Sequence, residues 1–231
     1  MGFDNDTPGG QTIGARVFGD LLPSTGLTQD PSFLSLSSPP AGSDALPVGV
    51  DVYWDFLPMT IDGVTSNLFH WDGQGDVGFS PALAETLTLY DPVFNSATVN
   101  GAAAAVPGER IGTTTSSALS LHAHRWWELA AGSGNPTAGI YATALRLRVD
   151  GFAPTEPFVV ALSTFGTPAS ALNDDAMPWF EDNLDDLFLA TDYNFDGLID
   201  DEDYGVWLAQ FGGSTPQPVD FGEADGNGDQ L

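Results

Sequence analysis

The chain has 231 residues, of which 32 are acidic, five are arginine and none is lysine, so its formal net charge at pH 7 is -27. This length suits one large β domain with a small appendage, or two compact units. Because the chain has almost nothing that could neutralise phosphates, nucleic acid and anionic membrane surfaces are excluded as partners.

The sequence also lacks cysteine, which excludes disulfides and thiolate chemistry. The first residues, Met1–Asp6, have neither the basic n-region nor the apolar h-region of a signal peptide. No stretch approaches the ~20 consecutive apolar residues that a membrane-spanning helix needs. The sequence therefore predicts no membrane span and shows no leader.

Residues 1–168 have the pattern of an all-β domain. Apolar residues alternate in short runs, interrupted by Gly, Pro, Asn, Asp and Ser, and this alternation is typical of strands. Segment 23–47, rich in Pro, Ser and Gly, is expected to be a long surface loop. Many short strands with turn-rich connections predict an antiparallel β-sandwich, of jelly-roll or Ig-like type. The expected strands are Thr12–Phe18, Val48–Phe56, Asn67–Trp71, Thr86–Tyr90, Ala97–Val99, Ala118–Leu129, Ile140–Val149 and Pro157–Ser163.

Residues 169–231 form a second predicted region with a helical period. Within 178–190 apolar residues recur at spacings of three and four, which predicts an amphipathic helix. A second helix is expected over about 201–210, where Trp207 and the following Phe211 are the nearest partners for the first helix. Half of the acidic residues lie in 174–231, which has no Lys or Arg. Two helices around an acidic loop predict a small EF-hand-like appendage. The apolar residues of the first helix are Phe180, Leu184, Leu187 and Phe188.

The loop between these helices, residues 192–203, carries the most specific motif in the chain. It has twelve residues, with acidic or amide side chains at alternating positions and Gly197 at the sixth position, where a calcium loop turns sharply. A calcium ion takes six to eight oxygen ligands at about 2.3–2.6 Å, and short acidic side chains around a tight turn supply them. The alternative is a solvated acidic turn. The predicted calcium ligands are Asp192, Asn194, Asp196, Leu198 through its carbonyl, Asp200 and Asp203.

A partial second copy of this motif follows near the last residue. Asp225, Asn227 and Asp229 repeat the first, third and fifth positions of the loop, but Gln230 stands where glycine is expected. These three residues are a possible second calcium half-site. The alternative is a polar terminal segment that binds nothing.

The loop and the helix after it resemble the first calcium repeat of a type I dockerin. The resemblance is carried by the sequence Asp192-Tyr-Asn-Phe-Asp-Gly-Leu-Ile-Asp, by Asp203-Tyr204 and by Trp207, and Asp225–Asp229 would begin a second, truncated repeat. In that family two repeats pack as a pair and bind a cohesin module. The resemblance therefore implies a cohesin-like partner, although one and a half repeats depart from the family's pattern.

The β domain resembles secreted all-β proteins with PEP-CTERM-type or dockerin-like ends. The similarity lies in Leu121-His-Ala-His-Arg-Trp-Trp, in Gly139-Ile-Tyr-Ala-Thr-Ala-Leu-Arg-Leu and in Thr155-Glu-Pro-Phe-Val-Val. It implies secretion and a cell-surface setting, and no reaction is attached to it. Calcium at millimolar concentration is an extracellular condition, which agrees with this expectation.

The three histidines form a second candidate site. His122 and His124 are two residues apart in a predicted strand, so their imidazoles should lie on the same face. With His70 from another strand they would form a three-nitrogen site for copper or zinc, to which Asp72 or Glu128 could add an oxygen. The alternative is a hydrogen-bonded, metal-free pair.

Aromatic residues form the third candidate site. Such rings offer flat surfaces to a sugar, which makes a carbohydrate-binding module with a polysaccharide partner an alternative function, although rings on strands are more often core. The rings in question are those of Tyr53, Trp54, Trp71, Tyr90, Trp126, Trp127 and Tyr141.

Sequence patterns of common enzymes are missing. There is no Gly-x-Ser-x-Gly elbow, Walker loop or Rossmann fingerprint, and without lysine there is no Schiff-base chemistry. We therefore expect a secreted, non-catalytic, calcium-binding protein of the cell surface or extracellular matrix that acts in attachment or self-assembly.

Overall fold

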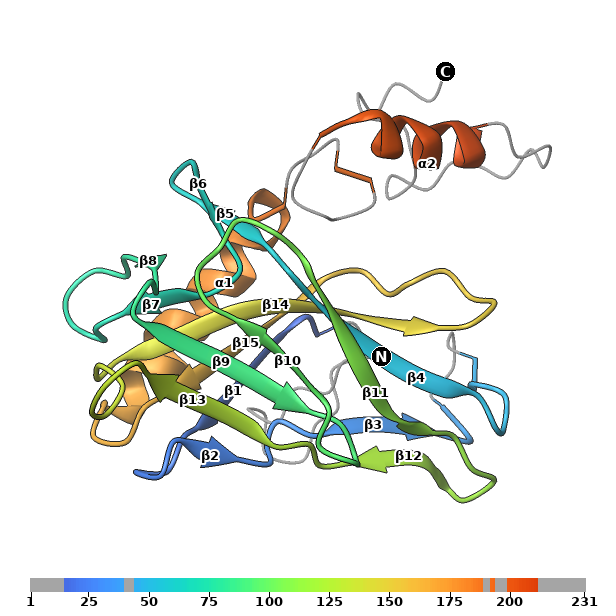
Figure 1. Ribbon diagram of the computed structural model, residues 1–231, viewed down its shortest axis with the longest axis horizontal. Coiled ribbons are helices and arrows are strands. Elements are labelled where there is room, and N and C mark those ends of the chain that lie inside the picture. The colour runs from blue at the N-terminus through green and yellow to red at the C-terminus, as the bar shows by residue number, and fades with distance from the viewer. Residues whose placement is uncertain (1–14, 40–43, 189–191, 194–198, 212–231) are drawn as a thin grey trace.

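The structure, a computed structural model, describes residues 15–39, 44–188, 192–193 and 199–211, and the side chains of 207–211 are not described (Figure 1). Within these ranges the chain is mostly β with a few helical segments near its C-terminal end, as predicted. The strands are β1 (Val17–Leu21), β2 (Leu27–Thr28), β3 (Phe33–Leu36), β4 (Asp51–Leu57), β5 (Met59–Ile61), β6 (Val64–Ser66), β7 (Phe69–Trp71), β8 (Ser80–Pro81), β9 (Glu85–Tyr90), β10 (Ser96–Val99), β11 (Val106–Thr113), β12 (Leu119–Ala123), β13 (Trp127–Ala131), β14 (Ile140–Val149) and β15 (Phe158–Ser163). The helical segments are the π-helix η1 (Ala171–Ala176), α1 (Met177–Asn183), the 3-10 turn η2 (Leu184–Asp186) and α2 (Asp201–Phe211).

The larger sheet has seven strands, in the order β1-β15-β14-β4-β11, with β7 beside β14 and β8 beside β7. All its pairs are antiparallel except β1 with β15. The long strand β14 is central to the sheet because two different strands pair with successive parts of one of its edges. Residues 140–142 pair with β7 and residues 144–149 pair with β4.

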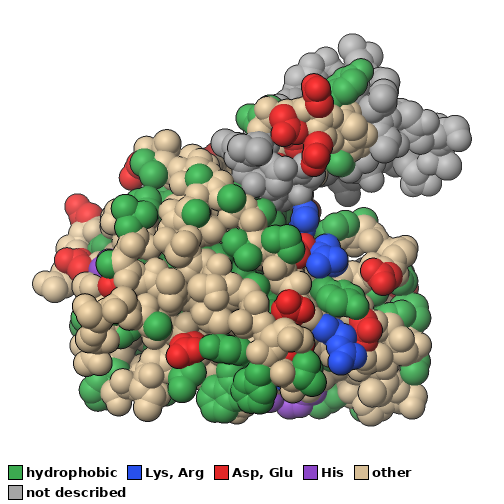
Figure 2. Space-filling view, in the orientation of Figure 1, with side chains coloured by type: hydrophobic (Ala, Val, Ile, Leu, Met, Phe, Trp, Pro, Cys, Tyr) green, Lys and Arg blue, Asp and Glu red, His purple; other side chains and the backbone are tan. Residues whose placement is uncertain are grey.

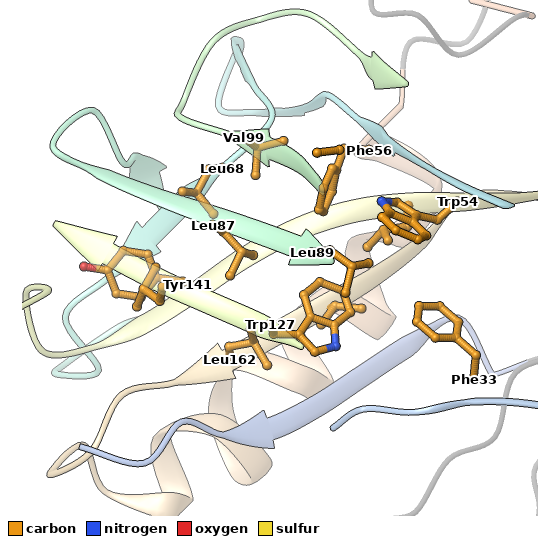
Figure 3. Close-up of a cluster of buried hydrophobic side chains, with 14 of the residues drawn as sticks. Phe33, Trp54, Phe56, Leu68, Leu87, Leu89, Val99, Trp127, Tyr141 and Leu162 are labelled. Carbon is orange, nitrogen blue, oxygen red and sulfur yellow. The ribbon is translucent and has the colours of Figure 1, made fainter. Parts of the chain in front are cut away.

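A second layer consists of a four-stranded antiparallel sheet, β10-β9-β13-β2, and the antiparallel pair β3–β12. Strand β9 has the period-two burial of a half-buried strand: Leu87 and Leu89 are buried and the threonines between and before them are not. The core between the layers contains Trp54 and Phe56 of β4 and Trp127 of β13, and their rings point toward one another (Figure 3). The fold is therefore sandwich-like, as the alternating pattern predicted.

The other face of the large sheet is covered by the helical segment 171–187. Phe180, Met177 and Leu172 are buried against strands β1, β7, β14 and β15, in a second apolar cluster separate from the first. Because these parts of β14 and β15 are covered on both faces, residues 140–145 and 159–163 are all buried. Fully burying one side chain such as Phe180 stabilises the fold by roughly 1.5–3 kcal/mol.

This packing corrects two sequence-based expectations. The apolar face of the helix at 178–190 packs on the sheet, so Trp207 and Phe211 are not needed as its partners. The segment from Ala171 to Leu187 thus shares the core of the β domain, and the boundary predicted at residue 169 falls inside one packed unit. The helix is also shorter than expected, since α1 ends at Asn183 and a 3-10 turn follows.

The strand predicted over 118–129 is two strands that belong to different sheets. β12 pairs with β3, and β13 pairs with β9 and β2. Arg125 lies at the break, where its Nε donates to the carbonyl of Ile111 over 2.7 Å. Two further strands, β2 and β3, lie within the predicted loop 23–47, and β11 was not predicted at all.

In the part of the chain that the structure describes, no helix is both long and apolar enough to cross a membrane.

Candidate functional site

The structure describes three of the six predicted calcium ligands. Asp192, Asp200 and Asp203 are the first, ninth and twelfth residues of the loop. Asn194, Asp196 and Leu198 lie outside the described residues, as do Asp225, Asn227 and Asp229 of the possible half-site. The geometry on view is therefore that of the two ends of the loop.

The carboxylates at the two ends of the loop are buried. Asp192 is 5% exposed and Asp203 is 3% exposed, whereas Ile199, at 60%, and Asp200 between them are exposed. Burying an ionised carboxylate costs several kcal/mol unless hydrogen bonds or a cation compensate it. Since residues 174–231 contain no Lys or Arg, no basic side chain of that segment can serve as the cation.

Asp200 and Asp203 also begin the helix α2. The Asp203 Oδ2 atom accepts the backbone N–H of Asp200 over 2.9 Å, and the Asp200 Oδ1 atom accepts that of Glu202 over 2.8 Å. This is the reciprocal arrangement of a capping box, with Asp at the place of the usual Glu. Acidic residues in the first turn also complement the positive end of the helix dipole. The local sequence therefore starts a helix at Asp201, the tenth position of the loop, without needing an ion.

The loop is connected to the β domain by a short, anchored segment. Leu187 is buried in the second core, and its carbonyl accepts the backbone N–H of Thr60 in β5 over 2.7 Å. Asp192, the first loop residue, lies five positions later. Leu187, five positions before the loop, is thus held on the β domain by its buried side chain and a backbone hydrogen bond.

The structure brings two of the three histidines together. His122 at the end of β12 and His124 just after it are both exposed on one side of the strand, as the i, i+2 spacing predicted. Their Nε2 atoms are 3.0 Å apart, and the ring centroids are 4.8 Å apart with the rings inclined at 60°. The Nδ1 atom of His124 lies 3.2 Å from Asp30 Oδ1.

His70 does not join this pair, so the predicted three-histidine site is wrong. His70 is in β7 of the large sheet, where its Nε2 lies 3.0 Å from the Ala138 carbonyl and its ring lies 4.6 Å from that of Tyr141. Figure 2 shows histidine side chains at two separate places. Among the described residues, no three His, Cys, Asp or Glu side chains are grouped so that they could hold a metal ion. The reason is topological, because β7 and β12 belong to different sheets.

The proposed oxygen ligands of that site have other partners. Asp72 Oδ1 accepts the backbone N–H of Gln74 over 3.0 Å, as in a turn, and Glu128 accepts the hydroxyl of Tyr90.

Most of the aromatic rings considered for sugar binding are core. Trp54, Trp71, Trp127 and Tyr141 are all buried and cannot present a face to a ligand. Trp126 is exposed, at 38%, and Tyr53 and Tyr90 are partly exposed. The structure therefore agrees with the packing explanation for these four rings.

A charged cluster on the outer face of the large sheet escaped the sequence analysis. Asp55 of β4 is buried, and its carboxylate accepts hydrogen bonds from Arg148 Nε at 2.5 Å, Arg146 Nε at 3.2 Å and the Gly108 backbone at 3.2 Å. Burial alone would raise the pKa of Asp55, but the hydrogen bonds, that of Arg148 foremost, outweigh it and hold the pKa below its ordinary value. The guanidinium of Arg148 also lies over the Tyr53 ring, 5.4 Å from its centroid.

This cluster contains three of the five arginines, since Arg110 pairs with Asp51 on the same face at 3.3 Å. Figure 2 shows basic side chains gathered in one strip with acidic ones beside them. The i, i+2 spacing of Arg146 and Arg148 was a usable signal that both lie on one face. The sequence did not predict that Asp55 is the partner of both arginines, because that depends on the β14–β4 register, which places Arg146 opposite Asp55. The cluster is internally paired, and the two remaining arginines, Arg16 and Arg125, lie elsewhere.

A cavity of about 600 Å³, which no sequence pattern predicted, lies between β1, β3 and the ends of β14 and β15. Its wall is mostly apolar and includes Phe33, Val52, Phe158 and Phe152, with Arg16 and Glu156 at the polar side. Arg16 and Glu156 pair with each other at 3.4 Å.

The sequence matches no protein-family model and no curated protein.

Proposed function

We propose that this protein is a non-catalytic, calcium-binding β-sandwich that acts in attachment or assembly at the cell surface or in the extracellular matrix. The calcium ion would bind at residues 192–203, through Asp192, Asn194, Asp196, Asp200, Asp203 and the carbonyl of Leu198. The observation that carries the proposal is the burial of Asp192 and Asp203 at the two ends of a twelve-residue loop with ligand spacing.

The chemistry of the loop favours a hard divalent cation. Oxygen atoms are its only ligands, and carboxylates, an amide and a carbonyl around a tight turn match the needs of Ca²⁺ better than those of a softer metal. A bound cation would compensate the buried carboxylates and reduce repulsion within a segment that holds half of the acidic residues. Asp203 is shorter than the Glu usual at the twelfth position, so we expect modest affinity, suited to extracellular calcium.

The anchoring of Leu187 gives this site a mechanical role. An ion that ties Asp192 to Asp203 would fix the start of α2 a few residues from a buried anchor of the β domain. Calcium would then order the acidic segment and present it to a partner. The resemblance to a dockerin repeat supports a cohesin-like partner, and a second copy of the chain is the alternative for assembly.

Titration calorimetry tests the calcium site. We expect one dominant site in the unaltered protein, and loss of that site in Asp192→Ala and in Asp196→Ala. Asp182→Ala is the matched control, because Asp182 is an exposed carboxylate in α1, outside the loop, and binding should stay unchanged. Calcium binding that persists unchanged in both loop variants would refute the proposal. Light scattering with calcium and with chelator then separates self-assembly from recruitment of another protein.

A carbohydrate-binding role is the weaker alternative. Four of the rings that suggested it are buried, so a polysaccharide would have to be recognised through Trp126 or the partly exposed Tyr53 and Tyr90. Glycan binding that is lost in Trp126→Ala would favour this alternative over attachment through the calcium segment.

A further inference from the structure

We infer that His122 and His124, oriented by Asp30, form a surface binding site for a divalent transition metal of square or octahedral preference, copper(II) foremost. The site is independent of the calcium loop, because it lies on β12 and the segment before β3 and uses nitrogen ligands. It uses two of the three histidines that the sequence suggested and leaves His70 out.

Asp30 determines which nitrogen of His124 is available. A carboxylate only accepts hydrogen bonds, so the Nδ1 atom of His124, 3.2 Å from Asp30 Oδ1, carries the proton. In the neutral ring the Nε2 atom is then left with its lone pair, directed at the Nε2 atom of His122 3.0 Å away. A carboxylate behind a metal-binding histidine commonly sets the tautomer and increases the basicity of the ligating nitrogen.

The distance between the two Nε2 atoms is short enough for both to bind one shared ion. If each nitrogen lies about 2.05 Å from a shared ion, their separation of 3.0 Å gives an N–metal–N angle of about 94°. A tetrahedral ion such as zinc would need a separation of roughly 3.3 Å for its angle near 109°. The right angle fits tetragonal copper(II) or nickel(II), and copper(II) also binds nitrogen sites most tightly among the divalent first-row metals.

The backbone holds the two rings in place. His122 is opposite Leu34 in the β3–β12 pair, and β3 follows Asp30 by a few residues, so the pairing brings Asp30 and the histidines to the same edge. The carbonyl of His124 accepts Arg125 Nη1 over 3.1 Å, while the same side chain is bound to Ile111. Both rings are exposed, so water can fill the remaining positions around the ion. The strongly negative chain also raises the local concentration of cations.

Without metal, the same geometry is a hydrogen bond from His122 Nε2–H to His124 Nε2. A metal ion would take the place of that proton, and His122 would move its own proton to Nδ1. Variants of the two histidines should weaken copper binding only if the pair binds the metal, so copper titrations distinguish a metal site from a hydrogen-bonded pair that binds no metal.

The test adds one equivalent of copper(II) to protein purified without a histidine tag, with calcium in excess so that the acidic loop is occupied. Electron paramagnetic resonance should show a tetragonal signal with coupling to two imidazole nitrogens. Trp126, exposed and two residues from His124, should report the titration through loss of fluorescence. His122→Gln and His124→Gln should each weaken binding at least tenfold, and His70→Gln should leave binding unchanged.

Asp30→Asn tests the orienting role. It should weaken copper binding roughly 10- to 100-fold while the coupling to two nitrogens remains, because only the support of His124 changes. The exposed positions of both rings predict unaltered circular dichroism in the His122 and His124 variants. Equal copper affinity in the double variant His122→Gln/His124→Gln, or an equal loss in His70→Gln, would overturn the inference. So would a copper signal with fewer than two nitrogen ligands.

Discussion

The β domain and the calcium loop are stabilised by opposite means. In the domain, apolar side chains from strands and from the segment 171–187 fill two clusters, one on each face of the large sheet. In the loop, residues 192–203, the buried side chains among the described residues are the carboxylates of Asp192 and Asp203, and nearby acidic residues increase their mutual repulsion. The domain therefore has a core that needs no ligand, whereas the loop needs hydrogen bonds and, we propose, a cation. Leu187, which is buried in the second apolar cluster, connects the β domain to the segment that leads into the loop.

The largest effect should come from Phe180→Ala. Phe180 is fully buried between the helix and the sheet and packs on Phe79 with the ring centroids 4.7 Å apart. Removing such a ring from a core costs about 3–5 kcal/mol. Denaturant unfolding should show this loss across the whole β domain, while Phe165→Ala, at an exposed ring, should stay within about 0.5 kcal/mol. A loss confined to the C-terminal segment would mean that the helix is not part of the domain core.

Calcium should stabilise the loop segment next most. At a hundredfold excess over the dissociation constant, ligand binding adds about 2.7 kcal/mol to the state that binds it. In chelator, thermal unfolding should separate into an early transition of the tail and a later one of the β domain. Asp192→Ala should unfold alike with and without calcium. If the unaltered protein gives the same single melting transition with calcium and with chelator, the prediction that calcium stabilises the loop segment and not the β domain is wrong.

Asp55→Asn probes the most deeply buried carboxylate among the described residues of strands β1 to β15. It should cost about 2 kcal/mol near neutral pH, since hydrogen bonds from two arginines to a buried carboxylate are weakened. The folded protein lowers the pKa of Asp55 below that of the unfolded chain, which is about 3.9. The ionised Asp55 carboxylate therefore stabilises the fold fully at pH values above the unfolded-state pKa, and this contribution is lost as the pH falls through the folded-state pKa. The free-energy gap between Asp55→Asn and the unaltered protein should therefore narrow below about pH 4. A gap that is constant with pH would indicate that Asp55 does not titrate in the folded state with a lowered pKa.

The smallest effect should come from Asp185→Ala. Asp185 is almost fully exposed and lies 3.7 Å from Arg16, and exposed ion pairs of this kind contribute less than about 0.5–1 kcal/mol. The matched variant Leu187→Ala should lower stability by about 2–5 kcal/mol, because its side chain is in the core. Similar losses in both variants would indicate that charge contributes as much as apolar burial to anchoring the segment before the loop.

Local patterns in the sequence predicted most of the β domain but not its irregular parts. Strands β4, β9, β14 and β15 alternate or are continuously apolar, and they lie close to the predicted ranges. Strand β11 contains Pro107, Gly108 and Gly112, which read as a loop. Gly108 is needed there because a Cβ atom would come within 2.4 Å of the Trp54 ring. That requirement comes from a strand far away in the sequence, so no local pattern reveals it.

The sequence by itself determined the negative charge, the spacing of the loop, the alternation of the strands and the shared face of His122 and His124. These properties depend on residues that are near one another in the chain. Tertiary structure alone decided that 171–187 would cover the large sheet, that His70 would lie apart and that Asp55 would meet two arginines. Each of these depends on which strands pair and in what register, and strand pairing is set by contacts between distant residues. The function proposed for the loop rests on the spacing of its residues together with the burial of Asp192 and Asp203, and the copper site rests on the shared face of the two histidines together with the position of Asp30.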